Sequence, residues 1–156
     1  MIKLTRIDDR LVHGQVALVW TPALSVDCLI VANDKVAKDD FLKMTLGFAK
    51  PANAKLLIKS LDETVAFVND PINQSLKILL IINSVQDALT LSDEIPEITS
   101  INFGGLRGKD GSKLISKAVA VTEAEIDISK QLLNKGIELE VRQVPSDKKL
   151  MLMDLL

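Results

Sequence analysis

The chain has 156 residues, of which 47% are hydrophobic and 26% charged, and its 19 basic and 21 acidic residues give a formal charge of −2. This length suffices for one domain with a sizeable core, and the composition argues against intrinsic disorder. The near-neutral charge and an aromatic content of 3% argue against a nucleic-acid-binding surface. The longest uncharged stretch, residues 11–26, is too short and too polar to span a bilayer. We therefore expect a single domain over residues 1–156 that is not inserted in a membrane.

The chain has one cysteine and its N-terminus lacks the apolar core of a signal peptide. A single cysteine excludes an internal disulfide and favours a reducing compartment, so we expect a cytoplasmic protein. Cys28 lies in an apolar run, which predicts a buried structural thiol rather than a nucleophile.

The first half of the chain alternates short, β-branched apolar runs with segments of helical periodicity. In chain order, we expect a strand at residues 2–7, a helix at 12–21, a strand at 28–32, a helix at 38–49, a strand at 55–58 and a helix at 62–68. The first of these helices should stop before Pro22, because a proline disfavours helical backbone in the residue that precedes it.

The second half begins with the clearest buried strand, residues 78–82, which is apolar throughout, as expected of a central parallel strand. It is followed by a helix at 85–91 with Ser84 as N-cap, strands at 100–103 and 118–121, a long helix, and a last strand at 137–142. Thr122 and Glu125 form a capping-box pattern at the start of the long helix, and Gly136 should end it. The last strand alternates apolar and charged residues, which predicts an edge position.

Such alternation of strands and helices predicts an α/β fold: a three-layer open sheet, mostly parallel, of about seven strands with helices on both faces. In open parallel sheets, ligands bind beyond the carboxyl ends of the strands, near a topological switch point. The loops that follow the predicted strands are therefore where a functional site is expected.

The loop after the first strand is the densest polar segment of the sequence. Arg6, Asp8, Asp9, Arg10 and His13, the only histidine, fall within eight residues at a strand-to-helix turn. Free N–H groups at a helix start and the donor fork of arginine suit an oxyanion such as phosphate. Histidine is a nucleophile at neutral pH and can form a covalent phospho-intermediate. Residue types alone leave open a second interpretation, in which the histidine caps a helix and the charges are solvated ion pairs.

Four residues of this loop have more specific expected roles. Gly14 removes side-chain bulk where a phosphoryl group or a partner would approach, and Asp9 is expected to orient Arg10 or the imidazole ring. Arg6 and Arg10 would supply a positive field at this loop.

The string Arg6-Ile-Asp-Asp-Arg-Leu-Val-His-Gly-Gln-Val16 closely resembles the signature of the IIB components of mannose/fructose/sorbose-type phosphotransferase systems (PTS). Further similar segments lie at residues 31–34, 104–107, 116–119 and 136–145, so the resemblance extends over nearly the whole chain.

The resemblance implies a phosphoryl carrier in sugar uptake. In that family, the histidine that matches His13 accepts a phosphoryl group on Nδ1 from a phosphohistidine of the IIA component. It then transfers the group to a sugar held by the membrane IIC/IID components. The matching Arg10 and backbone N–H groups hold the phosphate, and Asp34 and Arg107 are secondary candidates. The resemblance implies no metal or other cofactor. It also implies that the protein works at the inner face of the membrane, through its contact with the transporter complex. The sequence leaves the oligomeric state open, and a homo-oligomer is one option.

Residues 104–110, with glycines at 104, 105 and 108, resemble a P-loop superficially. The pattern fails because Phe103 stands where its first glycine should be and Asp110 where its Ser/Thr should be. We expect a flexible loop beside the site, in which Arg107 either contacts phosphate or a partner, or is part of an ordinary solvated turn.

Two alternatives come from other functional classes. A response-regulator-like domain would bind magnesium at Asp8 and Asp9, but no strand end offers the aspartate that such a domain phosphorylates. A dinucleotide-binding module would need a G-x-G-x-x-G after the first strand, which is absent.

The apolar tail, residues 148–156, would pack on the body of the domain or on a partner, and the sequence does not separate these options.

Overall fold

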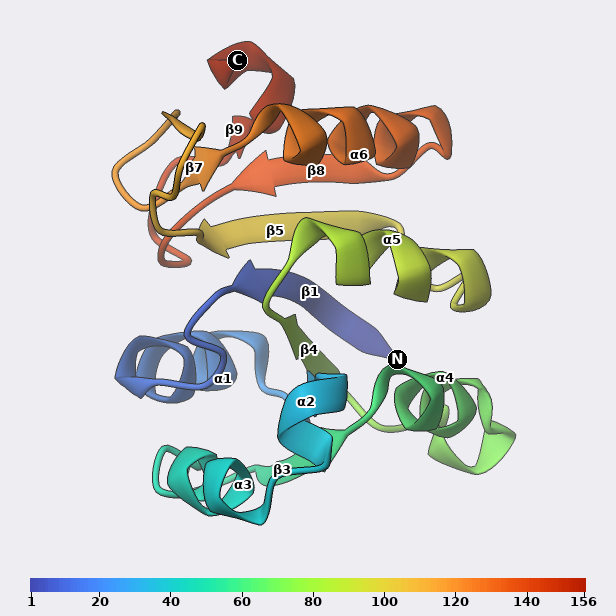
Figure 1. The fold of residues 1–156 in the computed structure, drawn as a ribbon. Helices are drawn as coiled ribbons and strands as arrows, with labels where there is room; N and C mark the ends of the chain where they lie inside the picture. Colours follow the sequence, from blue (N-terminus) through green and yellow to red (C-terminus); the bar gives the residue numbers. More distant parts are fainter.

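The computed structural model describes residues 1–156, which form a seven-stranded sheet in the order β3-β2-β4-β1-β5-β8-β9 (Figure 1). Neighbouring strands are parallel except at one edge, where β8 and β9 are antiparallel. A separate antiparallel pair consists of β6 and β7. The strands are β1 (Ile2–Asp8), β2 (Cys28–Ala32), β3 (Lys55–Lys59), β4 (Ile78–Ile82), β5 (Ser100–Gly105), β6 (Lys113–Leu114), β7 (Ala120–Val121), β8 (Glu138–Val141) and β9 (Leu150–Met151).

Helices connect these strands, and the arrangement confirms the expected α/β fold with a mostly parallel sheet. No helix has both the length and the apolar character needed to cross a membrane. The helical segments are η1 (Val16–Trp20, a π-helical turn), α1 (Thr21–Leu24), α2 (Asp34–Ala37), α3 (Asp40–Gly47), α4 (Leu61–Asn69), η2 (Pro71–Asn73), α5 (Val85–Glu94), α6 (Glu123–Asn134) and η3 (Leu152–Leu155).

The core lies on both faces of β4, every residue of which is buried. Successive side chains of a strand point to opposite faces. Leu80 therefore belongs to a hydrophobic cluster formed with α4, α5 and α6, whereas Leu79 belongs to a second cluster formed with η1, α1 and α3. The uninterrupted apolar run of this strand is thus explained by burial on both sides.

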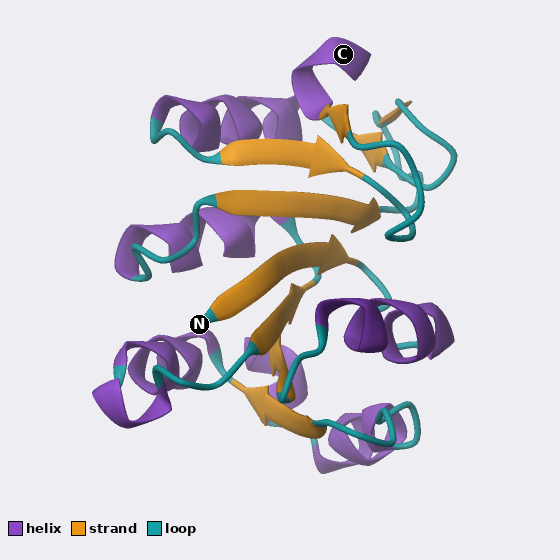
Figure 2. Cartoon of the chain, turned by 180° about the vertical axis from the view of Figure 1, so that it is seen from behind, coloured by secondary structure: helices purple, strands orange, loops and turns teal.

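The other half of the sheet has a helical layer on one face only. Figure 2 shows β5 and β8 from the side opposite to α5 and α6, with no helix in front of them. On this side, the central strands present polar residues that are nevertheless buried: Arg6, Asn102 and Glu140. The backbone that follows β8 lies over them, since the carbonyl of Arg142 accepts hydrogen bonds from Arg6 and Asn102. This polar inner face leads directly to the loop after β1.

Pro22 does not end the first helix, contrary to the sequence prediction. The N–H of Thr21 donates to the carbonyl of Val16, five residues back, which makes the preceding turn π-helical. The segment α1 follows this turn directly and ends at Leu24, with Pro22 near its start, a position that proline tolerates.

The helix expected at residues 38–49 is two shorter helices, α2 and α3. Asn33 accepts a hydrogen bond from the N–H of Val36, and Asp39 accepts one from Leu42, so each helix has its own N-cap. The prediction was wrong here because the apolar periodicity gave no sign of these two caps.

Three predicted helix ends are confirmed, whereas the predicted edge strand is wrong. Ser84 caps α5, Thr122 and Glu125 form both hydrogen bonds of the capping box of α6, and Gly136 follows α6 with a φ of 83°. The edge of the sheet is the two-residue strand β9, which pairs with β8. The charged residue Glu140 of β8 is 1% exposed and faces the polar inner side rather than solvent.

Candidate functional site

The centre of the sheet contains the point at which strand order reverses. β1 and β5 are neighbours, and the chain continues from β1 towards β2 on one side and from β5 towards β8 on the other. Ligands of open parallel sheets bind beyond the carboxyl ends of the strands at such a point. The loops that follow β1 and β5 lie there, and they contain most of the residues singled out from the sequence.

The loop after β1 is a tight, well-anchored turn. The N–H of Asp9 donates to the carbonyl of Gly105 (2.9 Å), and the N–H of Leu11 donates to the carbonyl of Asp8 (2.9 Å). Leu11 has a φ of 58°, a left-handed conformation that is uncommon for a residue with a branched side chain. Its side chain is 6% exposed and packs in the cluster under η1, so burial of this side chain stabilises the strained turn. The turn directs the chain back over the end of β1, where His13 follows.

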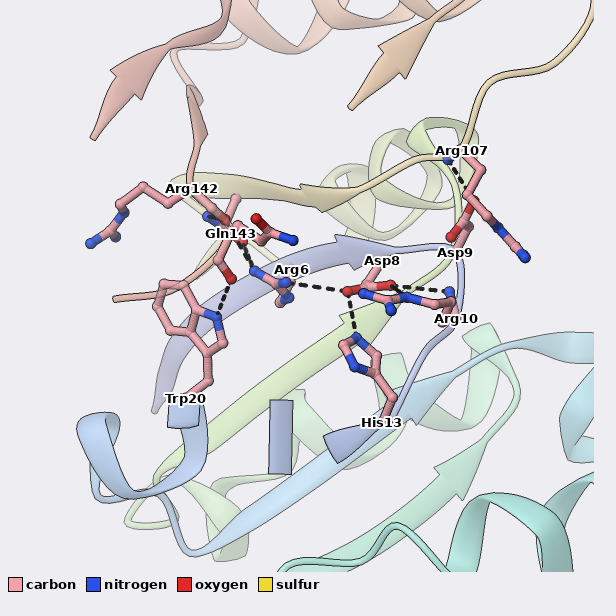
Figure 3. A network of polar contacts seen from close by, with 10 residues as sticks. Arg6, Asp8, Asp9, Arg10, His13, Trp20, Arg107, Arg142 and Gln143 are labelled. Carbon is pink, nitrogen blue, oxygen red and sulfur yellow. Dashed lines mark hydrogen bonds and ion pairs between the residues drawn. The ribbon is translucent and has the colours of Figure 1, made fainter. Parts of the chain in front are cut away.

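The imidazole of His13 is hydrogen-bonded to Asp8 (Figure 3). His13 Nε2 lies 2.8 Å from Asp8 Oδ2, and the histidine side chain is 18% exposed whereas the aspartate is fully buried. Because an ionised carboxylate only accepts hydrogen bonds, this contact assigns the ring proton to Nε2 and leaves a lone pair on Nδ1. Nδ1 makes no hydrogen bond to the protein and points away from Asp8 in Figure 3.

Asp8 is the residue that organises the loop. Its carboxylate also accepts from Arg6 Nη2 (3.2 Å) and from the backbone N–H of Arg10 (3.1 Å), and Arg10 Nε lies 3.5 Å away. The expectation that Asp9 orients Arg10 or the imidazole is therefore wrong, because Asp8 makes both contacts. The alternation of β1 places Asp8 on the same face as Arg6, and Asp9 follows after the strand has ended.

Asp9 instead ties the loop after β5 to the loop after β1. Its Oδ2 accepts from the backbone N–H of Arg107 (2.8 Å) and from Arg107 Nε (3.2 Å). The Arg107 side chain is 75% exposed, so its terminal nitrogens face solvent. Gly104 and Gly105, expected at the start of a flexible loop, are buried residues of β5.

Arg6 lies beneath the site rather than in it. Its side chain is 0% exposed, and Arg6 Nη1 donates to Asn102 Oδ1 (2.8 Å). Burial lowers the pKa of Arg6, and the ion pair with Asp8 opposes that effect. Because the guanidinium is buried, Arg6 supports the loop through Asp8. The positive field expected of Arg6 would therefore act from beneath the surface and stays a prediction.

The remaining predicted residues are Arg10, Gly14 and Asp34, and not all of them belong to the hydrogen-bond network around Asp8. Arg10 is 46% exposed, so its outer nitrogens are accessible beside His13. Gly14 is exposed, and a Cβ at this position would meet nothing within 4 Å. Asp34 is not part of the network, since it starts α2 and accepts a hydrogen bond from the N–H of Leu61 (2.8 Å).

The two adjacent aspartates do not form a metal site in this arrangement. Asp8 is bonded to Arg6 and His13, and Asp9 to Arg107, so their carboxylates are engaged by different cationic partners. No group of three or more potential metal-ligating side chains is present. The geometry therefore gives no support to a magnesium-dependent receiver.

Trp20, Arg142 and Gln143, which pack around the buried Arg6, were not identified from the sequence. Trp20 lies between two guanidinium groups, those of Arg6 and Arg142, each 5.3 Å from its ring centre. Its Nε1–H donates to the carbonyl of Gln143 (3.0 Å), which fastens the segment after β8 to η1. One signal in the sequence could have indicated this arrangement: alternation in β1 places Arg6 and Asp8 on one face, which calls for polar partners on the next strand.

Comparison with known proteins places the chain in a family. Residues 2–156 match the family described as "PTS system sorbose subfamily IIB component". A probable phosphotransferase enzyme IIB component of Streptococcus pyogenes is 38% identical over 162 residues, covering 99% of both chains. The mannose-specific EIIAB component of Escherichia coli is 37% identical over 156 residues, covering 100% of this chain but 48% of that longer protein. The crystal structure of the IIBSor domain of the sorbose permease from Klebsiella pneumoniae superposes with a TM-score of 0.93 at 32% identity, covering 99% of this chain and 95% of that chain. The chain therefore belongs to the sorbose subfamily of PTS IIB components, the phosphotransferase components of sugar transport systems.

Proposed function

We propose that this chain carries a phosphoryl group on Nδ1 of His13, received from a phosphohistidine of a IIA component and passed to a sugar held by IIC/IID membrane components. The observation that carries the proposal is the 2.8 Å hydrogen bond between His13 Nε2 and the buried Asp8. This bond fixes the ring and its tautomer, so that Nδ1 is the nitrogen with a free electron pair.

The transfer needs no base at His13. The electron pair on Nδ1 attacks phosphorus, the bond between phosphorus and the donor imidazole breaks, and its electron pair remains on the donor ring. His13 keeps its Nε2 proton throughout, and the positive charge that develops on its ring is stabilised by Asp8. On the acceptor side, the bond from phosphorus to Nδ1 breaks, while the sugar hydroxyl binds phosphorus and loses its proton to a base there.

Arg10 is the residue best placed to hold the moving phosphoryl group. Phosphoryl transfer depends mainly on positioning and on stabilising charge on the phosphoryl oxygens. Arg10 is fixed near its backbone by Asp8 and is exposed at its tip, so its guanidinium fork is free to bind two oxygens. Arg107, held by Asp9 on the neighbouring loop, is a second candidate for contact with phosphate or with a partner.

Cys28 is a poor alternative acceptor. It is 1% exposed and begins β2, whereas the candidate site lies beyond the opposite, carboxyl ends of the strands. Burial also raises the pKa of its thiol, which disfavours the reactive thiolate.

The partners and the location of the protein follow from this role. A carrier between IIA and IIC/IID would work in the cytoplasm, at the inner face of the membrane, and the name EIIAB of the Escherichia coli relative is consistent with a IIA partner. The names of the relatives include mannose, sorbose and fructose systems, and we propose no single sugar.

Intact-mass analysis after incubation with phosphorylated IIA tests the proposal. One phosphoryl group should be added to the wild type and to Cys28→Ser, and none to His13→Gln. The adduct should be lost in acid and survive alkali, as expected of a phosphohistidine. Transfer from purified phospho-IIA, freed of the upstream kinase, should continue in excess EDTA. An acid-stable adduct, an adduct on His13→Gln, or a transfer that requires magnesium would each reject the proposal.

A further inference from the structure

We propose that Arg6 is a positioning residue whose buried charge, held against Asp8, disfavours a second proton on the Asp8–His13 pair, so that Nδ1 of His13 stays free to attack. The inference rests on the proposed function in one respect, because it takes Nδ1 as the phosphoryl acceptor. It concerns a residue that cannot touch the phosphoryl group, since the side chain of Arg6 is 0% exposed.

Among the hydrogen-bond partners of the Arg6 side chain, only Asp8 carries a charge. Arg6 Nη2 lies 3.2 Å from Asp8 Oδ2, the same oxygen that accepts from His13 Nε2. Arg6 Nη1 donates to neutral acceptors, the side-chain oxygen of Asn102 and the carbonyl of Arg142. The positive charge of Arg6 is therefore directed at Asp8.

The space for Arg6 is built into the neighbouring strand. A Cβ on Gly104 would lie 2.0 Å from Arg6 Cζ, so the guanidinium occupies the volume that a side chain would fill. On its other side, the ring of Trp20 lies 5.3 Å from the guanidinium. Because the guanidinium packs between the backbone of Gly104 and the ring of Trp20, it has little freedom to move away from Asp8.

A second proton on the Asp8–His13 pair would block the chemistry wherever it settled. If it bound the imidazole, both ring nitrogens would carry a proton. If it bound Asp8, the acid would donate to Nε2, and the remaining ring proton would move to Nδ1. In both forms Nδ1 has no free electron pair, so the reactive state requires an ionised Asp8 and a neutral His13.

The charge of Arg6 opposes uptake of that second proton. A buried carboxylate without a cation binds a proton readily, and an opposite charge within hydrogen-bond distance counters this by about one to three pKa units. The charged and titratable groups around the pair are few. They are Arg6 on β1, Arg10 and His13 itself on the following loop, Glu140 on β8, whose charge acts on Arg6, and Arg142 beyond Trp20. Of these, Arg6 is the buried cation in direct contact with Asp8.

Arg142 provides a matched control. Its guanidinium also lies 5.3 Å from the centre of the Trp20 ring, but it pairs with Glu140 (2.7 Å) and not with Asp8. Arg6→Gln and Arg142→Gln thus each remove one arginine from Trp20, and only the first removes the charge from Asp8.

The single histidine makes the measurement direct, because ¹⁵N-histidine labelling gives one pair of ring-nitrogen signals. The midpoint of Nδ1 protonation is followed by NMR in the unphosphorylated protein. We expect Arg6→Gln to raise this midpoint by about one to three pH units. Arg142→Gln should leave it near the wild-type value, and Arg6→Lys, which keeps a positive charge, should show only a small part of the rise. An unchanged midpoint in Arg6→Gln, or an equal shift in Arg142→Gln, would overturn the inference.

A second comparison applies even if Arg6→Gln does not fold. Replacing a buried ion pair as a whole is often tolerated, so Arg6→Met with Asp8→Asn is compared with Asp8→Asn alone. Once Asp8 is neutral, only the direct repulsion between Arg6 and the protonated imidazole remains, so these two variants should differ by less than about one pH unit, and a larger difference would overturn the inference. The titration uses no phosphoryl donor, so a failure of the proposed function would be seen separately, in the mass experiment.

Discussion

Arg10 and Arg107 flank the site and differ in what fixes them. Arg10 extends from the loop after β1 beside Asp8, whereas Arg107 is held by Asp9 on the loop after β5. A lysine at position 10 keeps the charge but loses the planar donor fork. We expect Arg10→Lys to slow single-turnover transfer from phospho-IIA by about 10- to 1,000-fold, the range for loss of a directed transition-state contact. Arg107→Lys, at the second candidate residue, should slow it less, because Arg107 is held by Asp9 and does not contact Asp8. Equal rates for Arg10→Ala and the wild type would exclude this role.

Gly14 permits a second experiment on the same loop. A Cβ there meets no atom of the free protein within 4 Å, so Gly14→Ala should not disturb the fold by a clash. If the glycine leaves room for a partner, the variant should accept phosphate from a small donor such as phosphoramidate at the wild-type rate. It should accept phosphate from phospho-IIA more slowly, through a higher KM. Slower reaction with both donors would instead indicate that the alanine disturbs His13 itself.

At the scale of elements, the start of α5 contains a carboxylate in an unfavourable environment. Burial, and then the charge of Asp34, raise the pKa of Asp87. The folded state therefore holds this proton more tightly than the unfolded state, so Asp87 lowers stability as the pH rises through its raised pKa. We expect Asp87→Asn to be more stable than the wild type to urea at pH 7, and this advantage to disappear towards pH 3.5. In an Asp34→Asn background the advantage should shrink, and an advantage that grew towards low pH would contradict the prediction.

Elements with a strong local signal could be predicted from the sequence, and those fixed by tertiary contacts could not. The apolar run of β4 and the capping box of α6 lie in consecutive residues, so both were found. The π-turn before Pro22 ends at Trp20, whose ring nitrogen binds the carbonyl of the distant Gln143, and β9 pairs with β8 across a loop. Neither of these leaves a periodic pattern in the sequence.

The same distinction applies to the site. His13 and Arg10 stand in one short string, so the sequence indicated them. The roles of the neighbouring aspartates depend on which face of β1 each side chain takes and on what lies across the sheet. Asp8 meets Arg6 and His13, and Asp9 meets a residue 98 positions later, which only the strand order brings close.

At the scale of the whole molecule, stability should fall from the centre of the sheet to its edge. β4 is paired on both sides and fully buried, whereas β6 and β9 are exposed strands of two residues each. Amide hydrogens exchange fastest where local opening costs least. Hydrogen–deuterium exchange should therefore be slowest in β4 and the adjacent β1 and β2, and fastest in β6 and β9. Comparable protection of β6 and β4 would contradict this gradient of stability.

The glycine beside Arg6 also limits the order in which this sequence can change. Residues 6 and 104 share one volume, because the guanidinium of the first fills the space of a side chain on the second. An alanine at 104 collides with the long side chain at 6, whereas a shorter residue at 6 leaves Asp8 unpaired but opens that space. A mutational path that enlarges residue 104 must therefore pass first through the loss of Arg6, and in a pairwise mutational scan the two substitutions should show strong positive epistasis in folding.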